Sequence, residues 1–308
     1  LKSAPVWLGP WVQPLRRSNA MAAVATVAPG VASAFAPFCQ APPLPSLAAS
    51  AISAAVGEGR YVAPWGRPLE RVELRLLGRE LSVFTDDALG VAGRVWPAQE
   101  VAALHLRRLM LAEGGSSERT CRCGTVFELG AGCGALSVAL AEELGPDVRV
   151  VCTDLPEVVP LMELNCQVAS SSHLGSSVEC RALRWGDLDA AMALLTGGVG
   201  GSTAGSGRVG SSASTCVVAC EAAYWGGWDL FEEDTREPLA ATLHSLITGP
   251  EGFGLLVHEV RDPGREAGLF ELIRAKGLEV CRQEPRDAEP REGQIGAWVV
   301  RRDRGSRD

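Results

Sequence analysis

The sequence predicts a doubly wound α/β fold, in which a mostly parallel sheet of seven strands carries helices on both faces. Three observations support this prediction. Short apolar runs alternate with amphipathic stretches from residue 125 to residue 301, which is typical of parallel sheets. Glycines at 130, 132 and 134 end the first apolar run and lead into a helix pattern. An acid, Asp154, ends the next apolar run.

Strands are expected where apolar residues run on without interruption, and helices where they recur every three or four positions. Pro97 suits the first turn of a helix that we expect to end near Leu111. Before it, alternating apolar and charged residues over 69–84 predict a small N-terminal β-hairpin. The other expected helices cover 135–143, 157–168, 230–247 and 265–276, and the seven strands cover 125–129, 148–153, 178–183, 215–220, 253–260, 278–282 and 295–301.

Composition and charge exclude several classes of protein. Of the 308 residues, 46% are hydrophobic and 21% are charged, which is ordinary for a globular protein. The net charge of −8 argues against a nucleic-acid-binding surface, because such surfaces carry an excess of Lys and Arg. No apolar run reaches the roughly 18 residues of a membrane span. We therefore expect a monomer with no nucleic-acid partner and no membrane span.

The chain contains ten cysteines, but their spacing is not that of a metal site. Cys121 and Cys123 are one residue apart, and others, such as Cys152, Cys166 and Cys220, lie inside apolar runs. We expect reduced, mostly buried thiols in a reducing compartment and no metal site, because free cysteine behaves as a small apolar side chain. A disulfide framework is the alternative.

Two segments differ from the rest. Residues 1–60 are rich in Ala, Ser and Pro, and their first acidic residue is Glu58. This segment is interpreted as an extension of the domain at 61–308: a disordered tail, an organellar transit peptide or a secretory signal. The predicted location is therefore cytoplasmic or organellar. The second segment, 197–214, is almost entirely Gly, Ser, Ala and Val and predicts a flexible insertion without a catalytic role.

The strongest functional signal is the segment from Val126 to Gly134, which reads VFELGAGCG. Glycines allow positive φ angles and let a ligand approach the main chain. The helix that follows offers unpaired N–H groups. Asp154, after the next strand, could accept hydrogen bonds from both hydroxyls of a ribose. A nicotinamide dinucleotide would use the same parts, but Glu128 beside the loop is better suited to a cationic ligand with an amino-acid tail.

These residues resemble motif I of class I S-adenosylmethionine-dependent methyltransferases. Four further segments are similar to the family-16, methyltransferase-like branch, whose characterised members methylate protein lysines. They occur in the order of that family: Val95-Trp96-Pro97-Ala98, Thr153-Asp154-Leu155-Pro156 continuing to Asn165, Arg184-Trp185-Gly186-Asp187, and Glu221-Ala222-Ala223-Tyr224. The resemblance implies S-adenosylmethionine as the cofactor and a protein lysine side chain as the acceptor.

The resemblance also assigns roles to residues. Glu128 and the loop formed by Gly130, Ala131, Gly132 and Gly134 would hold the methionine part of the cofactor. Asp154 would bind the ribose, Leu155 would line the adenine pocket, and Trp96 and Trp185 would flank the cofactor. As an alternative, either tryptophan could belong to the core.

The fourth segment carries the predicted catalytic residues, Glu221 and Tyr224. The family has Asp where this chain has Glu221, so the carboxylate here extends one methylene further. Trp225 and Trp228 lie nearby and could hold an ammonium group by cation–π attraction. Alternatives remain open: Glu221 could be a solvated acid at a strand end, the acceptor could be a small molecule, or the chain could be a binding module with weakened catalysis.

Overall fold

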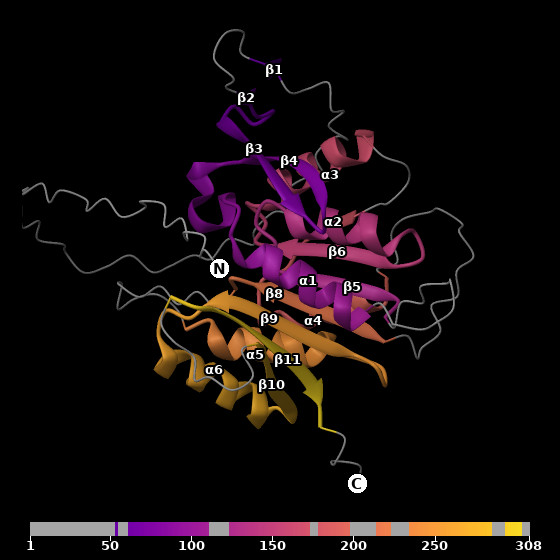
Figure 1. Ribbon diagram of the computed structural model, residues 1–308, viewed down its shortest axis with the longest axis vertical. Coiled ribbons are helices and arrows are strands. Elements are labelled where there is room, and N and C mark those ends of the chain that lie inside the picture. Colours follow the sequence, from indigo (N-terminus) through magenta and orange to yellow (C-terminus); the bar gives the residue numbers. More distant parts are fainter. Residues whose placement is uncertain are drawn as a thin grey trace, which may run out of the picture. The chain divides into compact units, whose positions relative to one another are not determined.

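A seven-stranded sheet forms the centre of the fold, in the order β10-β11-β9-β8-β5-β6-β7 (Figure 1). The computed structural model describes residues 53–54, 61–110, 123–172, 178–197, 214–222, 234–284 and 293–303. The strands are β5 (Thr125–Leu129), β6 (Arg149–Asp154), β7 (Val178–Ala182), β8 (Thr215–Cys220), β9 (Phe253–Glu259), β10 (Leu278–Glu284) and β11 (Ile295–Arg302). The predicted doubly wound fold is confirmed.

The strand order places a ligand crevice next to β5. Strands β6 to β9 run parallel with β5, whereas β11 is antiparallel to both β9 and β10. The chain first builds outward from β5 through β6 to β7 and then returns to place β8 on the other side of β5. Ligands of such sheets bind at the carboxyl ends of the strands where the order reverses. Here that point lies between β5 and β8.

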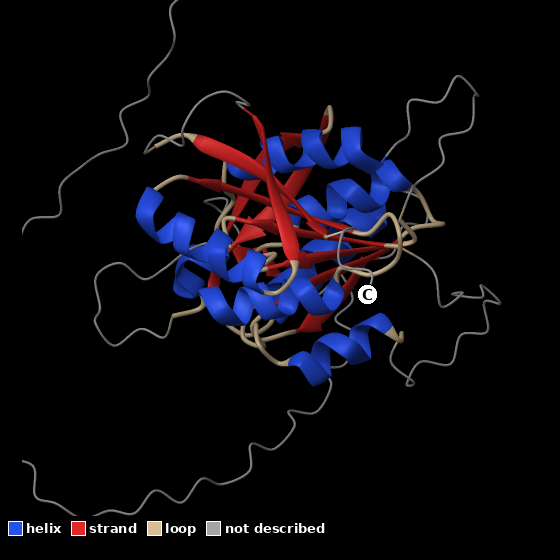
Figure 2. Cartoon of the chain, turned by 90° about the horizontal axis from the view of Figure 1, so that it is seen from below, coloured by secondary structure: helices blue, strands red, loops and turns tan. Residues whose placement is uncertain are grey.

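Helices cover both faces of the sheet (Figure 2). Successive side chains of a strand point to opposite faces, so Phe127 and Val126 of β5 enter different cores. Phe127 packs with α4 (Leu188–Leu195), α5 (Arg236–Leu246) and α6 (Pro263–Ala275). On the other face, Val126 packs with α1 (Ala98–Met110) and α2 (Ala135–Leu144), and α3 (Val159–Ser172) lies beside α2. Among the described helices, none is long and apolar enough to cross a membrane.

The predicted N-terminal hairpin is confirmed and belongs to a small antiparallel sheet of four strands. Its hairpin consists of β3 (Pro68–Leu76) and β4 (Arg79–Thr85), and β2 (Tyr61–Val62) and β1 (Ser53–Ala54) extend it. Leu77 and Gly78 form the turn between β3 and β4, and both have positive φ, as a tight hairpin turn requires. Asn165 of α3 ties β4 to the fold, since its side chain bonds to the backbone of Phe84 and of Cys133.

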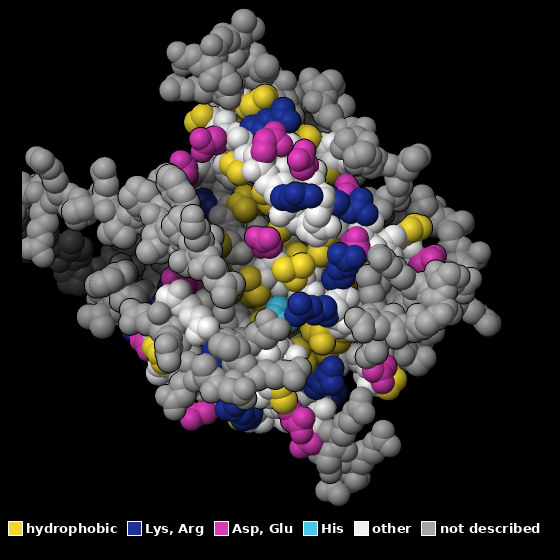
Figure 3. All heavy atoms as spheres, viewed as in Figure 1, with side chains coloured by type: hydrophobic (Ala, Val, Ile, Leu, Met, Phe, Trp, Pro, Cys, Tyr) yellow, Lys and Arg dark blue, Asp and Glu magenta, His cyan; other side chains and the backbone are white. Residues whose placement is uncertain are grey.

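The surface that carries α1 and the hairpin shows acidic and basic side chains next to one another (Figure 3). Ion pairs join the elements here: Arg79 of β4 lies 3.5 Å from Glu142 of α2, and Arg107 of α1 lies 3.3 Å from Glu143. The arginine of each pair is exposed, so water screens these ion pairs and each contributes little to stability. Apolar burial on both faces of the sheet therefore dominates the stability of the fold.

The N-terminal segment gives a first testable prediction. Strand β1 lies inside the segment 1–60 that we expected to be an extension; 1–52 and 55–60 lie outside the described residues. Deleting residues 1–52 should shift the melting temperature by less than about 2 °C, because an extension contributes little to the free energy of unfolding. A change of 1 kcal/mol would correspond to roughly 2–4 °C in a domain of this size. Thermal unfolding of the truncated protein measures this. A larger drop would show that the deleted segment packs on the domain.

The predicted insertion, 197–214, begins and ends at residues that the structure describes. Residues 198–213 lie outside the described residues, but Ser214 is buried and its Oγ accepts a hydrogen bond from the Glu251 N–H at 3.0 Å. Replacing 198–213 by a short turn should be tolerated, because loop closure depends only weakly on length. Extending the deletion to Ser214 should destabilise the protein, which thermal unfolding of the two variants compares. Equal melting temperatures would contradict a structural role of Ser214.

Candidate cofactor and acceptor site

A cavity of about 320 Å³ opens at the carboxyl ends of β5, β6 and β8, at the point where the strand order reverses. Its volume lies in the range of small-molecule sites. The predicted cofactor residues Trp96, Gly130, Ala131, Gly132, Asp154, Leu155 and Trp185 all line it, together with Glu221. The structure therefore brings together residues from five separate segments of the sequence.

Neighbouring residues pack closely against both sides of the glycine loop between β5 and α2. Gly130 has a φ of 68°, and a Cβ there would lie 3.2 Å from Cζ2 of Trp185. Gly132 has a φ of 57°, and a Cβ there would lie 2.7 Å from the carbonyl oxygen of Ala92. Ala92 belongs to the 3-10 helix η2 (Asp87–Gly93), which the sequence analysis missed. Gly134 does not line the cavity; it is the N-cap residue that precedes helix α2.

Asp154 supports the loop and faces the cavity. Its Oδ2 accepts a hydrogen bond from the N–H of Gly132 at 2.7 Å, and its Oδ1 accepts one from the N–H of Leu155 at 2.7 Å. Burial raises the pKa of this carboxyl, and the two backbone hydrogen bonds counteract the rise. Because each carboxylate oxygen has a second lone pair, both can still accept from a ligand hydroxyl. This geometry fits the predicted ribose contact.

Glu128 lies behind the loop rather than on the wall of the cavity. It is 1% exposed, and Oγ of Ser137 donates to its Oε2 at 2.5 Å. Burial raises the pKa of Glu128 to about 7. Its Oε1 is buried and has no hydrogen-bond donor among the described residues. Any influence on the methionine part of the cofactor would therefore act through the loop, by charge, rather than by direct contact.

The two predicted tryptophans both line the cavity, although they differ in packing. Trp96 is held by a hydrogen bond from its Nε1 to the carbonyl oxygen of Val91, at 3.0 Å. Trp185 packs against Gly130 and also against the core under α5. Both interpretations that the sequence left open therefore apply to Trp185, because its ring packs against the core and also lines the cavity.

Glu221 occupies the end of β8 in an unusual backbone conformation, with a φ of 54°. Its side chain is 7% exposed, and its Oε1 accepts a hydrogen bond from the Glu259 N–H at 3.0 Å. Its Oε2 is buried, accepts no hydrogen bond among the described residues, and lies 2.8 Å from Nη1 of Arg261. Glu221 is thus a buried acid at the cavity rather than a solvated one. Tyr224, Trp225 and Trp228 lie outside the described residues.

Arg261 is the main residue that the sequence analysis missed. It follows β9, and its guanidinium lies over the ring of Trp96 and lines the cavity. The only signal in the sequence is its position after a predicted strand whose carboxyl end faces the site. That signal does not distinguish Arg261 from its neighbours Glu259 and Asp262.

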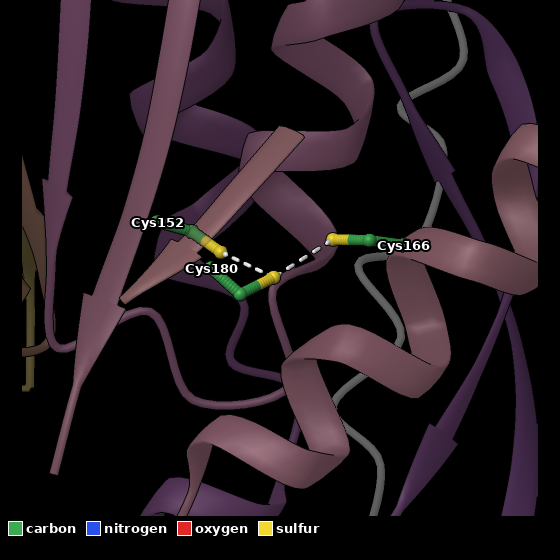
Figure 4. A group of neighbouring side chains, drawn as sticks. All are labelled: Cys152, Cys166 and Cys180. Atoms are coloured by element: carbon green, nitrogen blue, oxygen red, sulfur yellow. Dashed lines mark hydrogen bonds between the residues drawn. The ribbon is translucent and has the colours of Figure 1, made fainter. Parts of the chain in front are cut away.

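Three buried thiols lie together outside the cavity: Cys152 of β6, Cys180 of β7 and Cys166 of α3 (Figure 4). Sγ of Cys180 lies 3.4 Å from that of Cys152 and 3.6 Å from that of Cys166. The sequence did not indicate this cluster, because its members come from distant elements. Hydrogen bonding within the cluster and burial raise the pKa of the Cys152 thiol. Hydrogen bonding with Cys152 and Cys166 lowers the pKa of the Cys180 thiol. All three side chains are buried, and buried cysteine packs as a small apolar side chain, so we interpret the cluster as part of the core.

The cavity residues fit S-adenosylmethionine. Asp154 offers acceptors for ribose hydroxyls, Leu155 and Trp185 offer apolar surface for adenine, and the glycine loop leaves room along its main chain. The buried, unpaired Oε1 of Glu128 favours a cationic ligand above the loop. Three arginines, Arg94, Arg184 and Arg261, also line the cavity.

Comparison with known proteins finds a family model that matches part of the chain. A family model described as "Lysine methyltransferase" matches residues 76–194, which confirms the predicted resemblance over that part of the chain. No curated protein matches the chain significantly. Solved structures that it resembles include a TehB-like SAM-dependent methyltransferase from Corynebacterium glutamicum (14% identity, TM-score 0.39, covering 70% of this chain and 91% of that one). Another is an O-methyltransferase from Bacillus cereus in complex with SAH (14%, 0.43, 70% and 86%).

Proposed function

We propose that this S-adenosylmethionine-dependent methyltransferase transfers its methyl group to the Nζ of a lysine side chain in a protein. One observation supports this acceptor above the others. Glu221 places a buried carboxylate oxygen without a hydrogen-bond donor among the described residues at the cavity, and the Arg261 guanidinium lies within reach of both this oxygen and the ring of Trp96. An acid and an aromatic face are the partners that a protein offers to an amine.

The residues of this chain would position the amine rather than activate it chemically. S-adenosylmethionine, when bound, supplies a methyl group on a positively charged sulfur. The amine of lysine has a pKa of about 10.4 in water, and it must release a proton to the solvent before its nitrogen can attack. Desolvation in the cavity lowers the pKa of an amine. Glu221 would accept a hydrogen bond from an N–H of the amine and so direct the lone pair of its nitrogen along the reacting axis.

The cofactor end of the site gives a direct prediction. Asp154→Ala should weaken the binding of both S-adenosylmethionine and S-adenosylhomocysteine, because charge-assisted hydrogen bonds to the ribose are lost, each worth about 1.5–3 kcal/mol. The loop should also loosen, because the Gly132 N–H loses its acceptor. Calorimetric titration measures both affinities. Unchanged affinity in this variant, or tighter binding of NADH than of S-adenosylhomocysteine by the wild type, would contradict the cofactor site.

The acceptor is tested with a cell extract and methyl-labelled S-adenosylmethionine. The label should enter proteins, and acid hydrolysis should release it as N-methylated lysine. Label that stays in the small-molecule fraction would instead show a small acceptor. Cofactor binding without any transfer would support a binding module.

A further inference from the structure

Arg261 occupies the part of the cavity that the proposed acceptor needs. Its Cζ lies 5.7 Å from the ring centroid of Trp96, within the range of a cation–π contact. Its Nη1 lies 2.8 Å from Oε2 of Glu221, and its Nη2 lies 3.4 Å from Oε2 of Glu259. The chain's own guanidinium thus has both partners that a lysine ammonium would use, the acid and the aromatic face.

The contacts of Arg261 allow its side chain to move away from Glu221. Its side chain is 35% exposed, so the guanidinium can return to water when it leaves Glu221. Oε2 of Glu221 is within ion-pair distance of Arg261 but accepts no hydrogen bond among the described residues. A better-directed donor would therefore compete well for this oxygen. Glu259, whose side chain is 43% exposed, already contacts Arg261 and could keep it when Glu221 is taken.

Glu221, by contrast, is held in place. Its carboxylate is buried and accepts the Glu259 N–H through Oε1, and its backbone has a positive φ that is uncommon for glutamate. The surrounding structure therefore fixes the acid and leaves the arginine movable. Removing the cation from such an acid leaves a buried charge without compensation, which a second cation would relieve.

We propose that Arg261 determines the acceptor selectivity of this site, as a built-in cation that the acceptor nitrogen must displace from Glu221 and Trp96. This inference rests on the proposed function, since it takes Glu221 as the acceptor residue. An acceptor with its own cationic, hydrogen-bonding nitrogen replaces every contact that Arg261 gives up. An uncharged acceptor replaces neither the charge nor the cation–π contact, so its affinity is reduced most. Arg261 is thus a specificity-determining residue that reduces affinity for all acceptors and reduces it least for amines.

The test uses n-butylammonium chloride, which imitates a lysine side chain, titrated into the full chain saturated with S-adenosylhomocysteine. Arg261→Gln should bind it about fivefold more tightly than the wild type, because the site no longer holds a competing cation. Arg261→Lys, which keeps the charge, should stay within about twofold of the wild type. Arg265→Gln removes the same charge from a residue that does not line the cavity, and it should bind like the wild type.

With a protein acceptor, the same change in Arg261→Gln should appear as a KM about fivefold lower. Equal butylammonium affinity in the wild type and Arg261→Gln would overturn the inference. So would butyrate binding that is lost with the arginine, because Arg261 would then recruit an anionic acceptor. Arg261→Met keeps the apolar stem over Trp96 and serves if the Gln variant does not fold. Failure of the wild type to methylate lysine contradicts the proposed function and leaves the butylammonium comparison unaffected.

Discussion

Replacing Glu221 by Ala should lower kcat/KM for methyl transfer to a protein acceptor by about 100-fold or more. The acid is buried and fixed at the cavity, and misplacing a reacting group by about 1 Å can cost that factor. Affinity for S-adenosylhomocysteine should change little. Strand β5 lies between β8, which carries Glu221, and β6, which carries Asp154, so about 10 Å of sheet separates the two acids.

Glu221→Asp is the informative companion, because it restores the residue of the related family. Aspartate tolerates a positive φ better than glutamate, so the backbone should accept it. Its side chain is one methylene shorter and loses reach to the Glu259 N–H and to Arg261. We therefore expect Asp to be slower than Glu but faster than Ala, measured as steady-state methylation with cofactor binding followed separately. Full activity of Glu221→Ala would remove this residue from the mechanism.

Glu128→Gln should stabilise the cofactor-free protein by about 3 kcal/mol at pH 8. The pKa of Glu128 rises from 4.5 to about 7 on folding because burial penalises the charged form. A carboxyl with a raised pKa favours folding below pH 4.5, and this contribution is lost as the pH rises to about 7. The difference of about 2.5 pKa units corresponds to roughly 3 kcal/mol. Denaturant unfolding at pH 5 and pH 8 measures this, and the gain should be larger at pH 8.

The matched control is Glu279→Gln, which removes the same charge from an exposed position of β10 and should leave the pH dependence as in the wild type. A Glu128→Gln variant with unchanged stability at pH 8 would show that the carboxyl is not destabilised by burial. The stabilised variant should also bind S-adenosylmethionine more weakly, because a neutral amide no longer attracts its positive charge. A group that lowers stability while serving a ligand is typical of functional sites.

The arrangement of strands and helices was largely predictable, because each element has a strong local pattern. The apolar run at 125–129 and the glycines after it could hardly form anything except a buried strand and a tight turn. Helix α4 and η2 were missed because both are short. The N-cap residue of α4 is Asp187, and the hydrogen bond that its side chain accepts from the Ala190 N–H is visible only in the structure. Strand β1 was missed because a pairing of two residues leaves no periodicity in the sequence.

The cofactor half of the site was predictable for a different reason, which is that its residues lie at or shortly after the carboxyl ends of strands. Gly130, Asp154 and Trp185 lie in segments whose order along the chain indicates the function. The acceptor half depends on contacts between distant elements. No sequence feature near Arg261 predicts its contact with Trp96, and no feature near Glu128 predicts that this residue lies behind the loop. Such contacts depend on how side chains pack, and neither periodicity nor spacing records them.

One measurement tests most directly whether the cavity joins a cofactor site to a lysine site. The ligand is S-adenosylhomocysteine extended at the position of the transferred methyl group by a short chain that ends in an amine. Calorimetry should show that the wild type binds it at least tenfold more tightly than S-adenosylhomocysteine, because the amine reaches Glu221. Glu221→Ala should bind the two ligands equally, and Asp154→Ala should bind both weakly. Equal affinity of the wild type for the two ligands would contradict the account.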